Sequence, residues 1–579
     1  MDDTITREIV KSALAVAVEE ASIVVVRSAY SAFIQEGADA CAALLDARAR
    51  LVSQSDATSL MHGASLRASL PALLEDFEIA SMQPGDVYVL NDPYRGGIHA
   101  NDLLVFRPIF VDAAVAWFGG TLIHVADLGG AYPAGLASLA TDVFSEGLVL
   151  PPTRLYAAGK PVLSVQRLLA ANSRTPDMVL GDVRALVAGV NIISTRVREL
   201  IARHGASDLA RIADDSIAYA EKRMREELRQ IPRGVYRGAF RIDGDGIVAD
   251  AHYDVRARVE VGDGDVHVDF EGTSPQSPGA INASLSQILS GVVYAVRCFA
   301  DPTIPMNEGC FRVIRASFPE GSLVNPLPPA ACGGRVVSVT AGTEAVLAAL
   351  SSALPQHAVA QSAIIHVYAL SGVDDAGVPW LCLNYDFGGL GARSGSDGAD
   401  ATGAFFLGGR SVIPQIEPLE GRFPLRFLRA SLLEDSGGAG TWRGGRGTES
   451  AVRVLTDAEL TVRGDRIDVP PGGLGGGAAG VGGSYHVLRG DGRREPLHSK
   501  QAKVKLRAGD VFVMRTSGGG GLGPPTGRDP ECVCADVDAR RVSRAAADSV
   551  YGVVLDASGR VDDDATDARR RAIAGAASA

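Results

Sequence analysis

Two histidines and one aspartate near the start of the chain have the types and spacing of metal ligands. His99 and Asp102 are three residues apart, and His124 follows in Ile123-His124-Val125-Ala126-Asp127. Two imidazoles and a carboxylate leave open positions for water or substrate, which a catalytic divalent ion requires. Such an ion can acidify water and polarise a carbonyl or phosphoryl oxygen. On spacing alone a second interpretation stays open, in which His99 and Asp102 only hydrogen-bond a loop.

Short apolar runs surround these residues and predict the strands that position them. They end in clusters of Gly, Asp or Pro, which is typical of buried strands that feed loops. Loops held by rigid strands are common places for functional sites. The predicted strands cover residues 41–45, 87–90, 103–106 and 121–125, and helices are predicted over 4–32, 191–204 and 216–230.

The rest of the chain predicts a fold that mixes α/β and α+β parts. Residues 249–270 alternate apolar and polar side chains around Gly262-Asp263-Gly264, which predicts an antiparallel hairpin. Helices are predicted over 284–299 and 343–354, and short strands between Gly-rich turns from about residue 400. We therefore expect three regions: an α/β metal-binding region over 1–231, an α+β region with the hairpin over 232–400, and a β-rich, Gly-rich region over 401–579.

Charge and composition exclude several classes of partner. The net charge of -12 argues against nucleic acid, because no basic stripe exists to displace counterions from phosphates, and it disfavours an anionic membrane. The acidic N-terminus lacks the features of a signal peptide, and no apolar run approaches the roughly 18 residues that span a bilayer. The seven cysteines are scattered without a Cys-x-x-Cys pair, which suits reduced thiols. We expect a cytoplasmic protein.

The Gly-rich stretches do not predict a nucleotide site. The sequence contains no Gly-x-x-x-x-Gly-Lys-Ser/Thr loop and no Gly-x-Gly-x-x-Gly that opens a strand-turn-helix unit. We interpret residues 437–447 and 518–523 as tight turns or close packing, with a nest for a substrate phosphate as the alternative. Asp397, which lies in another Gly-rich stretch, is interpreted as a turn residue, with a catalytic role as the alternative.

The residues around His99 resemble the signature of a known family. Asn91-Asp92-Pro93-Tyr94-Arg95-Gly96-Gly97-Ile98-His99-Ala100-Asn101-Asp102 is similar to the Asn-Asp-Pro-Tyr-x-Gly-Gly-Thr-His-x-x-Asp motif of the hydantoinase B/oxoprolinase family. Further family-like blocks follow in order along nearly the whole chain, at residues 36–39, 146–152, 269–274, 304–309, 435–445 and 517–523.

The resemblance implies a metal-binding catalytic subunit. By analogy, His99, Asp102 and His124 hold a divalent ion (Zn, Mn or Fe), and Asp39 is a fourth ligand or a base. His62 and Asp127 are further catalytic or ligand-supporting candidates. The family's ATP site lies on a separate hydantoinase A-type subunit, so the resemblance implies a hetero-oligomer that opens a cyclic amide after the partner has phosphorylated it.

Two alternatives and three departures accompany this resemblance. The same site could serve a ketone carboxylase of the acetone or acetophenone type, or the chain could be a non-catalytic assembly partner. The family usually carries Arg at the position of Gly37 and Thr at that of Ile98, and many relatives carry His at that of Val125. None of these changes touches the three proposed ligands, but they suggest an altered substrate preference or a weakened enzyme.

Overall fold

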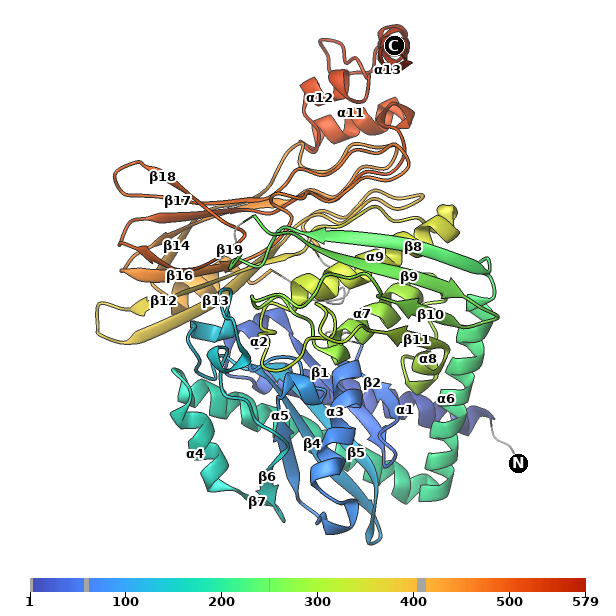
Figure 1. The fold of residues 1–579 in the computed structure, drawn as a ribbon, viewed down its shortest axis with the longest axis vertical. Coiled ribbons are helices and arrows are strands. Elements are labelled where there is room, and N and C mark those ends of the chain that lie inside the picture. The colour runs from blue at the N-terminus through green and yellow to red at the C-terminus, as the bar shows by residue number, and fades with distance from the viewer. Residues whose placement is uncertain (1–3, 57–61, 249, 404–412, 579) are drawn as a thin grey trace. The chain divides into compact units, whose positions relative to one another are not determined.

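The computed structural model describes residues 4–56, 62–248, 250–403 and 413–578 (Figure 1). Residues 1–3, which belong to the acidic N-terminus, lie outside the described part. The chain forms two compact units. The first unit comprises Met1–Phe240, Asp254–Ala349 and Phe406–Pro414, and the second comprises Arg241–Tyr253, Leu350–Phe405 and Gln415–Ala579. The predicted mixture of helices and strands is confirmed. The division at residues 231 and 400 stays a prediction.

The first unit is built around an antiparallel sheet with the strand order β2-β1-β5-β4-β3-β6-β7. All the strands predicted around the site are present in it. Their bounds are β1 Ala40–Asp46, β2 Leu51–Gln54, β3 Val87–Leu90, β4 Asp102–Val111, β5 Ala114–His124, β6 Thr153–Ala157 and β7 Lys160–Pro161. The central strands are buried along most of their length, so both faces of the sheet must be covered.

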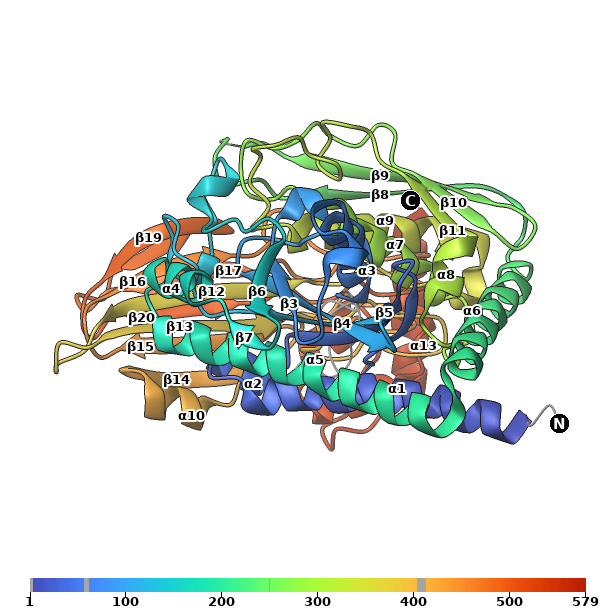
Figure 2. The same cartoon turned by 90° about the horizontal axis from the view of Figure 1, so that it is seen from below.

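Helices cover the two faces of this sheet. Successive strand residues point to opposite faces: a Cβ on Gly119 would meet Ile193 of α5, and one on Gly120 would meet Leu66 of α3. Figure 2 shows α1 and α5 side by side, and both contribute buried residues to the same apolar clusters. The helices of this part of the chain are α1 Thr4–Ser28, α2 Ala32–Gly37, α3 Gly63–Asp76, α4 Leu163–Ala171, α5 Pro176–His204 and α6 Ala206–Leu228.

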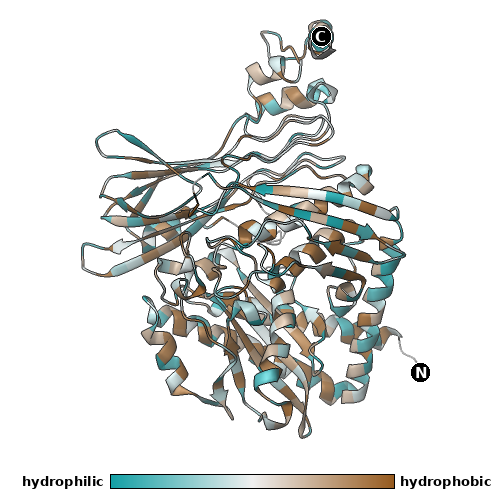
Figure 3. Cartoon of the chain, viewed as in Figure 1, coloured by the Kyte–Doolittle hydropathy of each residue, from teal (hydrophilic) through white to brown (hydrophobic). Residues whose placement is uncertain are grey.

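A smaller sheet in the order β11-β10-β9-β8 contains the predicted hairpin. Its burial alternates strictly along β9, as bands of brown and teal along β8 and β9 in Figure 3 show. The strands are β8 Gly234–Ile242, β9 Tyr253–Val261, β10 Val266–Asp269 and β11 Ile314–Ser317, and the accompanying helices are α7 Leu285–Arg297, α8 Glu308–Val313 and α9 Val336–Ala353.

Within the described part of the chain, two helices, α5 and α9, are long and apolar enough to cross a membrane by length and composition. In α5 61% of the apolar window is buried inside the protein, and in α9 89%. Helices that are buried all round are apolar because they lie in a core. The apolar residues of both helices therefore lie largely inside the protein.

The second unit contains two antiparallel sheets that share one core. Tyr368 and Leu460 from one sheet and Val452 and Phe512 from the other belong to the same buried cluster. The sheets have the orders β13-β12-β16-β19 and β14-β15-β20-β17-β18. Their strands are β12 Ile365–Val373, β13 Pro379–Phe387, β14 Leu425–Leu432, β15 Thr448–Val454, β16 Ala458–Arg463, β17 Ser484–Leu488, β18 Arg494–Leu497, β19 Lys500–Leu506 and β20 Val511–Arg515, and the helices are α10 Ile416–Arg422, α11 Pro530–Asp538, α12 Arg544–Ser549 and α13 Asp563–Ser578.

Glycine-rich segments of the second unit pack backbone against backbone. Gly519 donates to the carbonyl of Gly445, and Gly438 donates to the carbonyl of Gly519. A Cβ on Gly519 would lie 2.0 Å from the oxygen of Leu390, and one on Gly389 would lie 1.9 Å from that of Gly445. Side chains cannot fit between these segments, so the predicted close packing is confirmed and explains the abundance of glycine here.

Candidate metal centre

The Asn91–Asp102 segment is a tight loop whose polar residues hold its shape. The Asn91 side chain donates to the carbonyls of Ala100 and Leu148 and accepts from the N–H of Leu150. Asp92 accepts from the N–H of Tyr94 at 2.9 Å, and Gly96 adopts a positive φ of 88° that favours glycine. These contacts fix the end of the loop, so His99 is presented at the start of β4.

Strand register then brings the other two predicted ligands beside His99. Asp102, the first residue of β4, pairs with His124, the last residue of β5. Paired residues on antiparallel strands carry their side chains on the same face, about 5 Å apart. On the other side of β5, Ala40 pairs with Ile123, which places Asp39 at the same edge of the sheet. The ends of three neighbouring strands thus bring acidic and imidazole side chains to the same end of the sheet.

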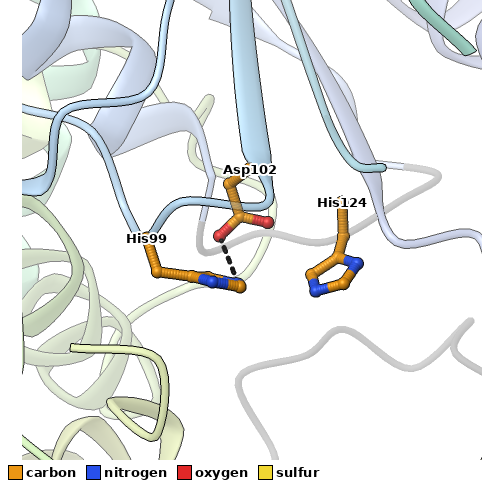
Figure 4. Close-up of side chains that lie close together, drawn as sticks. All are labelled: His99, Asp102 and His124. Atoms are coloured by element: carbon orange, nitrogen blue, oxygen red, sulfur yellow. Dashed lines mark ion pairs between the residues drawn. The ribbon is translucent and has the colours of Figure 1, made fainter. Parts of the chain in front are cut away.

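The three predicted ligands converge on one point, as Figure 4 shows. One potential ligand atom from each of His99, Asp102 and His124 lies within 4.8 Å of the other two, and all three residues are buried. The Nε2 of His99 lies 3.2 Å from Oδ2 of Asp102, and the two imidazole centroids are 5.0 Å apart. Phe33 packs against the ring of His124 at 5.3 Å. The sequence therefore predicted a real juxtaposition of side chains.

Asp39 and His62 form a second pair at this edge. The Nε2 of His62 lies 2.7 Å from Oδ1 of Asp39, and the Asp39 side chain is 23% exposed whereas His62 is buried. Burial raises the pKa of Asp39, but the charges of His62, His124 and Arg335 and the hydrogen bond from His62 outweigh it and leave that pKa below its ordinary value. Among the described residues, Asp39 is not in the cluster that lies within 4.8 Å. Its role as a fourth ligand stays a prediction.

Asp127 is held by a different set of contacts. Its two oxygens accept from the backbone N–H groups of Gly129, Ala134 and Arg174 and from the Arg174 guanidinium, at 2.7 to 3.2 Å. The carboxylate is fully buried. Because both oxygens are already used, we assign Asp127 to holding the loop after β5, and the geometry gives no support to a role as the base.

The structure adds one residue that sequence reasoning missed. Arg335, which directly precedes α9, donates from Nη2 to Oδ2 of Asp102 at 2.9 Å, and its side chain is 9% exposed. It is separated from Asp102 by 233 positions in the sequence. No local motif marks it, since Gly333-Gly334-Arg335 resembles any glycine-rich turn.

The three departures from the family motif lie outside the cluster. Ile98 and Val125 are fully buried, and Val125 belongs to the apolar core of the sheet. Gly37 is the last residue of α2. The side chains at positions 98 and 125 therefore serve packing in this chain.

The residues present fit a divalent ion. Oδ1 of Asp102 is buried and has no hydrogen-bond partner among the described residues, which is costly unless another group satisfies it. Ligand atoms at about 2.1 Å from one ion are at most about 4.2 Å apart, so only a small contraction of the cluster would be needed. Two imidazoles and one carboxylate are the donor set that Zn, Mn and Fe accept.

The chain belongs to the hydantoinase B/oxoprolinase family, whose sequence model matches residues 3–525. The B-type component of a putative D-/L-hydantoinase from Pseudomonas sp. (strain NS671) is 29% identical over 585 residues, covering 98% of each chain. The beta chain of the caprolactamase of Pseudomonas jessenii is 30% identical over 591 residues, covering 98% of this chain and 99% of that one.

Solved structures agree with this assignment. A chain in the crystal structure of the ATP-dependent caprolactamase from Pseudomonas jessenii superimposes with a TM-score of 0.89 at 28% identity, over 98% of this chain and 99% of that one. A chain of nucleotide-free acetone carboxylase has the same fold, with a TM-score of 0.89 at 20% identity, over 99% of this chain and 83% of that one.

Proposed function

We propose that this chain is the metal-dependent catalytic subunit of an ATP-dependent cyclic amide hydrolase. The observation that carries the proposal is the buried cluster of His99, Asp102 and His124 in a chain that aligns over its whole length with components of a hydantoinase and a caprolactamase. The substrate class is a hydantoin, 5-oxoproline or lactam ring. The partner is a hydantoinase A-type subunit that uses ATP, and the complex is cytoplasmic.

An amide carbon is a poor electrophile, so the reaction needs activation before water can attack. In the proposed reaction, the partner transfers the γ-phosphoryl group of ATP to the amide oxygen and releases ADP. Water then adds to the carbon, the C–N bond breaks, and the ring nitrogen takes a proton. The resulting acyl phosphate is hydrolysed by a second water to a carboxylate and inorganic phosphate.

The side chains at the candidate metal centre have distinct roles in the proposed reaction. His99, Asp102 and His124 would hold the ion, which when bound supplies Lewis acid chemistry and lowers the pKa of water. Asp39 accepts the proton of the attacking water, because its carboxylate is partly exposed at the same end of the sheet as the three proposed ligands. His62 orients the Asp39 carboxylate through the contact between Nε2 and Oδ1.

The test is an ATP-dependent assay with the complex. The chain is co-expressed and co-purified with a hydantoinase A-type subunit, and hydantoin, 5-oxoproline and lactams are screened for ring opening. His124→Ala should abolish product while part of the ATPase activity of the partner persists, and His267→Ala, on the hairpin strand β10, should leave both unchanged. Equal turnover by His124→Ala and the wild type would refute the proposal.

Two further arms of the same screen address the alternative functions. Product from acetone or acetophenone that requires bicarbonate would identify a ketone carboxylase instead. Absence of bound Zn, Mn and Fe from gently purified protein, together with no turnover of any substrate, would identify a non-catalytic assembly partner.

A further inference from the structure

Arg335 is a buried cation beside the candidate metal centre. Its Nη2 is committed to Oδ2 of Asp102, which leaves Oδ1 of the same carboxylate without a partner among the described residues. The Nε of Arg335 is likewise buried with no hydrogen-bond partner in the described part of the chain. A buried guanidinium with an unsatisfied N–H is costly, so a ligand that accepts from it would stabilise the site.

Formal charge at this edge favours an anion once a divalent ion is present. The carboxylates of Asp39 and Asp102 carry two negative charges, and Arg335 carries one positive charge. The charges of a divalent ion, Asp39, Asp102 and Arg335 sum to one positive charge, whereas without Arg335 they would sum to zero. Arg335 also directly precedes α9, an 18-residue helix whose N-terminus adds partial positive charge.

We infer that Arg335 makes the metal-loaded centre an oxyanion site that binds the phosphate group of the activated substrate. The inference rests on the proposed function, which requires a phosphorylated intermediate. It makes Arg335 a substrate-binding residue as well as a positioning residue for Asp102. A planar guanidinium suits this role because its fork of donors matches a tetrahedral oxyanion, which an ammonium group cannot do.

The test measures binding of inorganic phosphate to the full chain by calorimetry, with and without prior loading with Zn²⁺ or Mn²⁺. The variants are Arg335→Gln, which removes the charge, and Arg335→Lys, which keeps the charge and loses the fork. The matched control is Arg67→Gln, which breaks a different arginine–carboxylate pair of the first unit, with Glu308. Metal content and thermal transition are recorded for each protein.

The loaded wild type should bind phosphate, and Arg335→Gln should weaken that binding at least about tenfold at equal metal content, because charge-assisted hydrogen bonds are lost. Arg335→Lys should fall between the two, and Arg67→Gln should match the wild type. If Arg335→Gln does not fold, a weakening of about threefold or more in Arg335→Lys supports the inference, and an unchanged affinity refutes it.

Three results would overturn the inference. The first is that Arg335→Gln and the wild type bind phosphate with the same affinity. The second is that Arg67→Gln loses as much phosphate affinity as Arg335→Gln. The third is that Arg335→Gln takes up metal and the wild type does not. The last result would mean that the guanidinium replaces the ion. If the wild type binds metal but its phosphate affinity does not depend on Arg335, only this inference is refuted. If neither the wild type nor any variant binds metal, the metal centre of the proposed function is refuted.

Discussion

Three carboxylates near the candidate metal centre have different surroundings, and these surroundings separate their proposed roles. Asp102 keeps one buried oxygen without a partner among the described residues, whereas both oxygens of Asp127 are used by backbone and guanidinium donors. Asp39 is partly exposed and paired with His62. The contacts of each carboxylate therefore match the parts proposed for them, with Asp102 as a ligand, Asp127 as a loop anchor and Asp39 as a proton acceptor.

Replacing Asp102 with Asn should remove the ion. The change keeps the shape of the side chain but removes the negative charge, so metal affinity should fall by more than about 100-fold, because changes to supporting residues alone cost 10–100-fold. Elemental analysis after dialysis measures the metal content. Asp112→Asn is a matched control, because Asp112 lies exposed in the turn at the other end of the β4–β5 hairpin with a positive φ that Asn tolerates. Full metal content in Asp102→Asn would contradict the assigned ligand set.

Replacing Asp127 with Asn should instead destabilise the first unit. An amide cannot satisfy the four donors that the carboxylate accepts, so the cost should be about 1–3 kcal/mol. Metal content should stay close to that of the wild type. Thermal unfolding and elemental analysis on the same sample check this. Loss of metal without loss of stability would make Asp127 a catalytic candidate again.

At the scale of elements, strand register is the device that assembles the site. The pairs Asp102↔His124 and Ala40↔Ile123 align the ends of β1, β5 and β4. Their positions are supported by the covering helices, because α1 and α5 pack into the apolar core behind the same strands. The site lies on rigid strand ends and one hydrogen-bonded loop, which limits the movement of the ligands.

The glycine-rich segments of the second unit should tolerate no side chain at their closest contacts. Gly519→Ala would place a Cβ 2.0 Å from the carbonyl oxygen of Leu390, so the backbone must shift. The expected loss is about 3 kcal/mol or more. Gly490→Ala is the control, because a Cβ there meets nothing within 4 Å. Thermal and denaturant unfolding of both variants measure the difference, and equal stability would show that these segments are loosely packed.

At the scale of the whole molecule, buried titratable groups make stability depend on pH. Burial raises the pKa of Asp386 to about 6, and the hydrogen bond from Ser450 only partly offsets this. The unfolded value is about 3.9, so the folded protein holds this proton more tightly, and the stability from Asp386 falls as pH rises from about 4 to about 6. His366, whose burial lowers its pKa to about 3, gives the opposite dependence below about pH 6.5.

Comparing Asp386→Asn with the wild type isolates the first of these two effects. The variant has no charge to bury, so its free energy of unfolding relative to the wild type should rise between pH 4 and pH 6 and then level off, by up to roughly 2–3 kcal/mol. Urea unfolding at a series of pH values measures the difference. A difference that is constant with pH would show that Asp386 titrates near its ordinary value.

Local patterns in the sequence predicted the strands around the candidate site and the three side chains that meet there. Apolar periodicity predicted β1, β3, β4 and β5, and the motif singled out His99, Asp102 and His124. The strands and the proximity of these three side chains could be predicted because strand patterns and short motifs are local, and because two hydrophobic strands of one hairpin can pair in few registers. Their role as ligands stays a prediction. The predicted helix over 4–32 is interrupted after Ser28, where buried Asp182 of α5 accepts from the N–H groups of Tyr30 and Ser31.

The pairing of distant charges could not be predicted from the sequence, because it depends on how separate elements pack. Arg335 reaches Asp102 across 233 positions, and Arg174 occupies Asp127 across 47. Neither contact leaves a periodic signal, because a buried ion pair depends on how separate elements pack and not on the spacing within one of them. The residues of the candidate site could therefore be identified from a local motif. The charge balance that would select its ligand arises only when distant segments fold together.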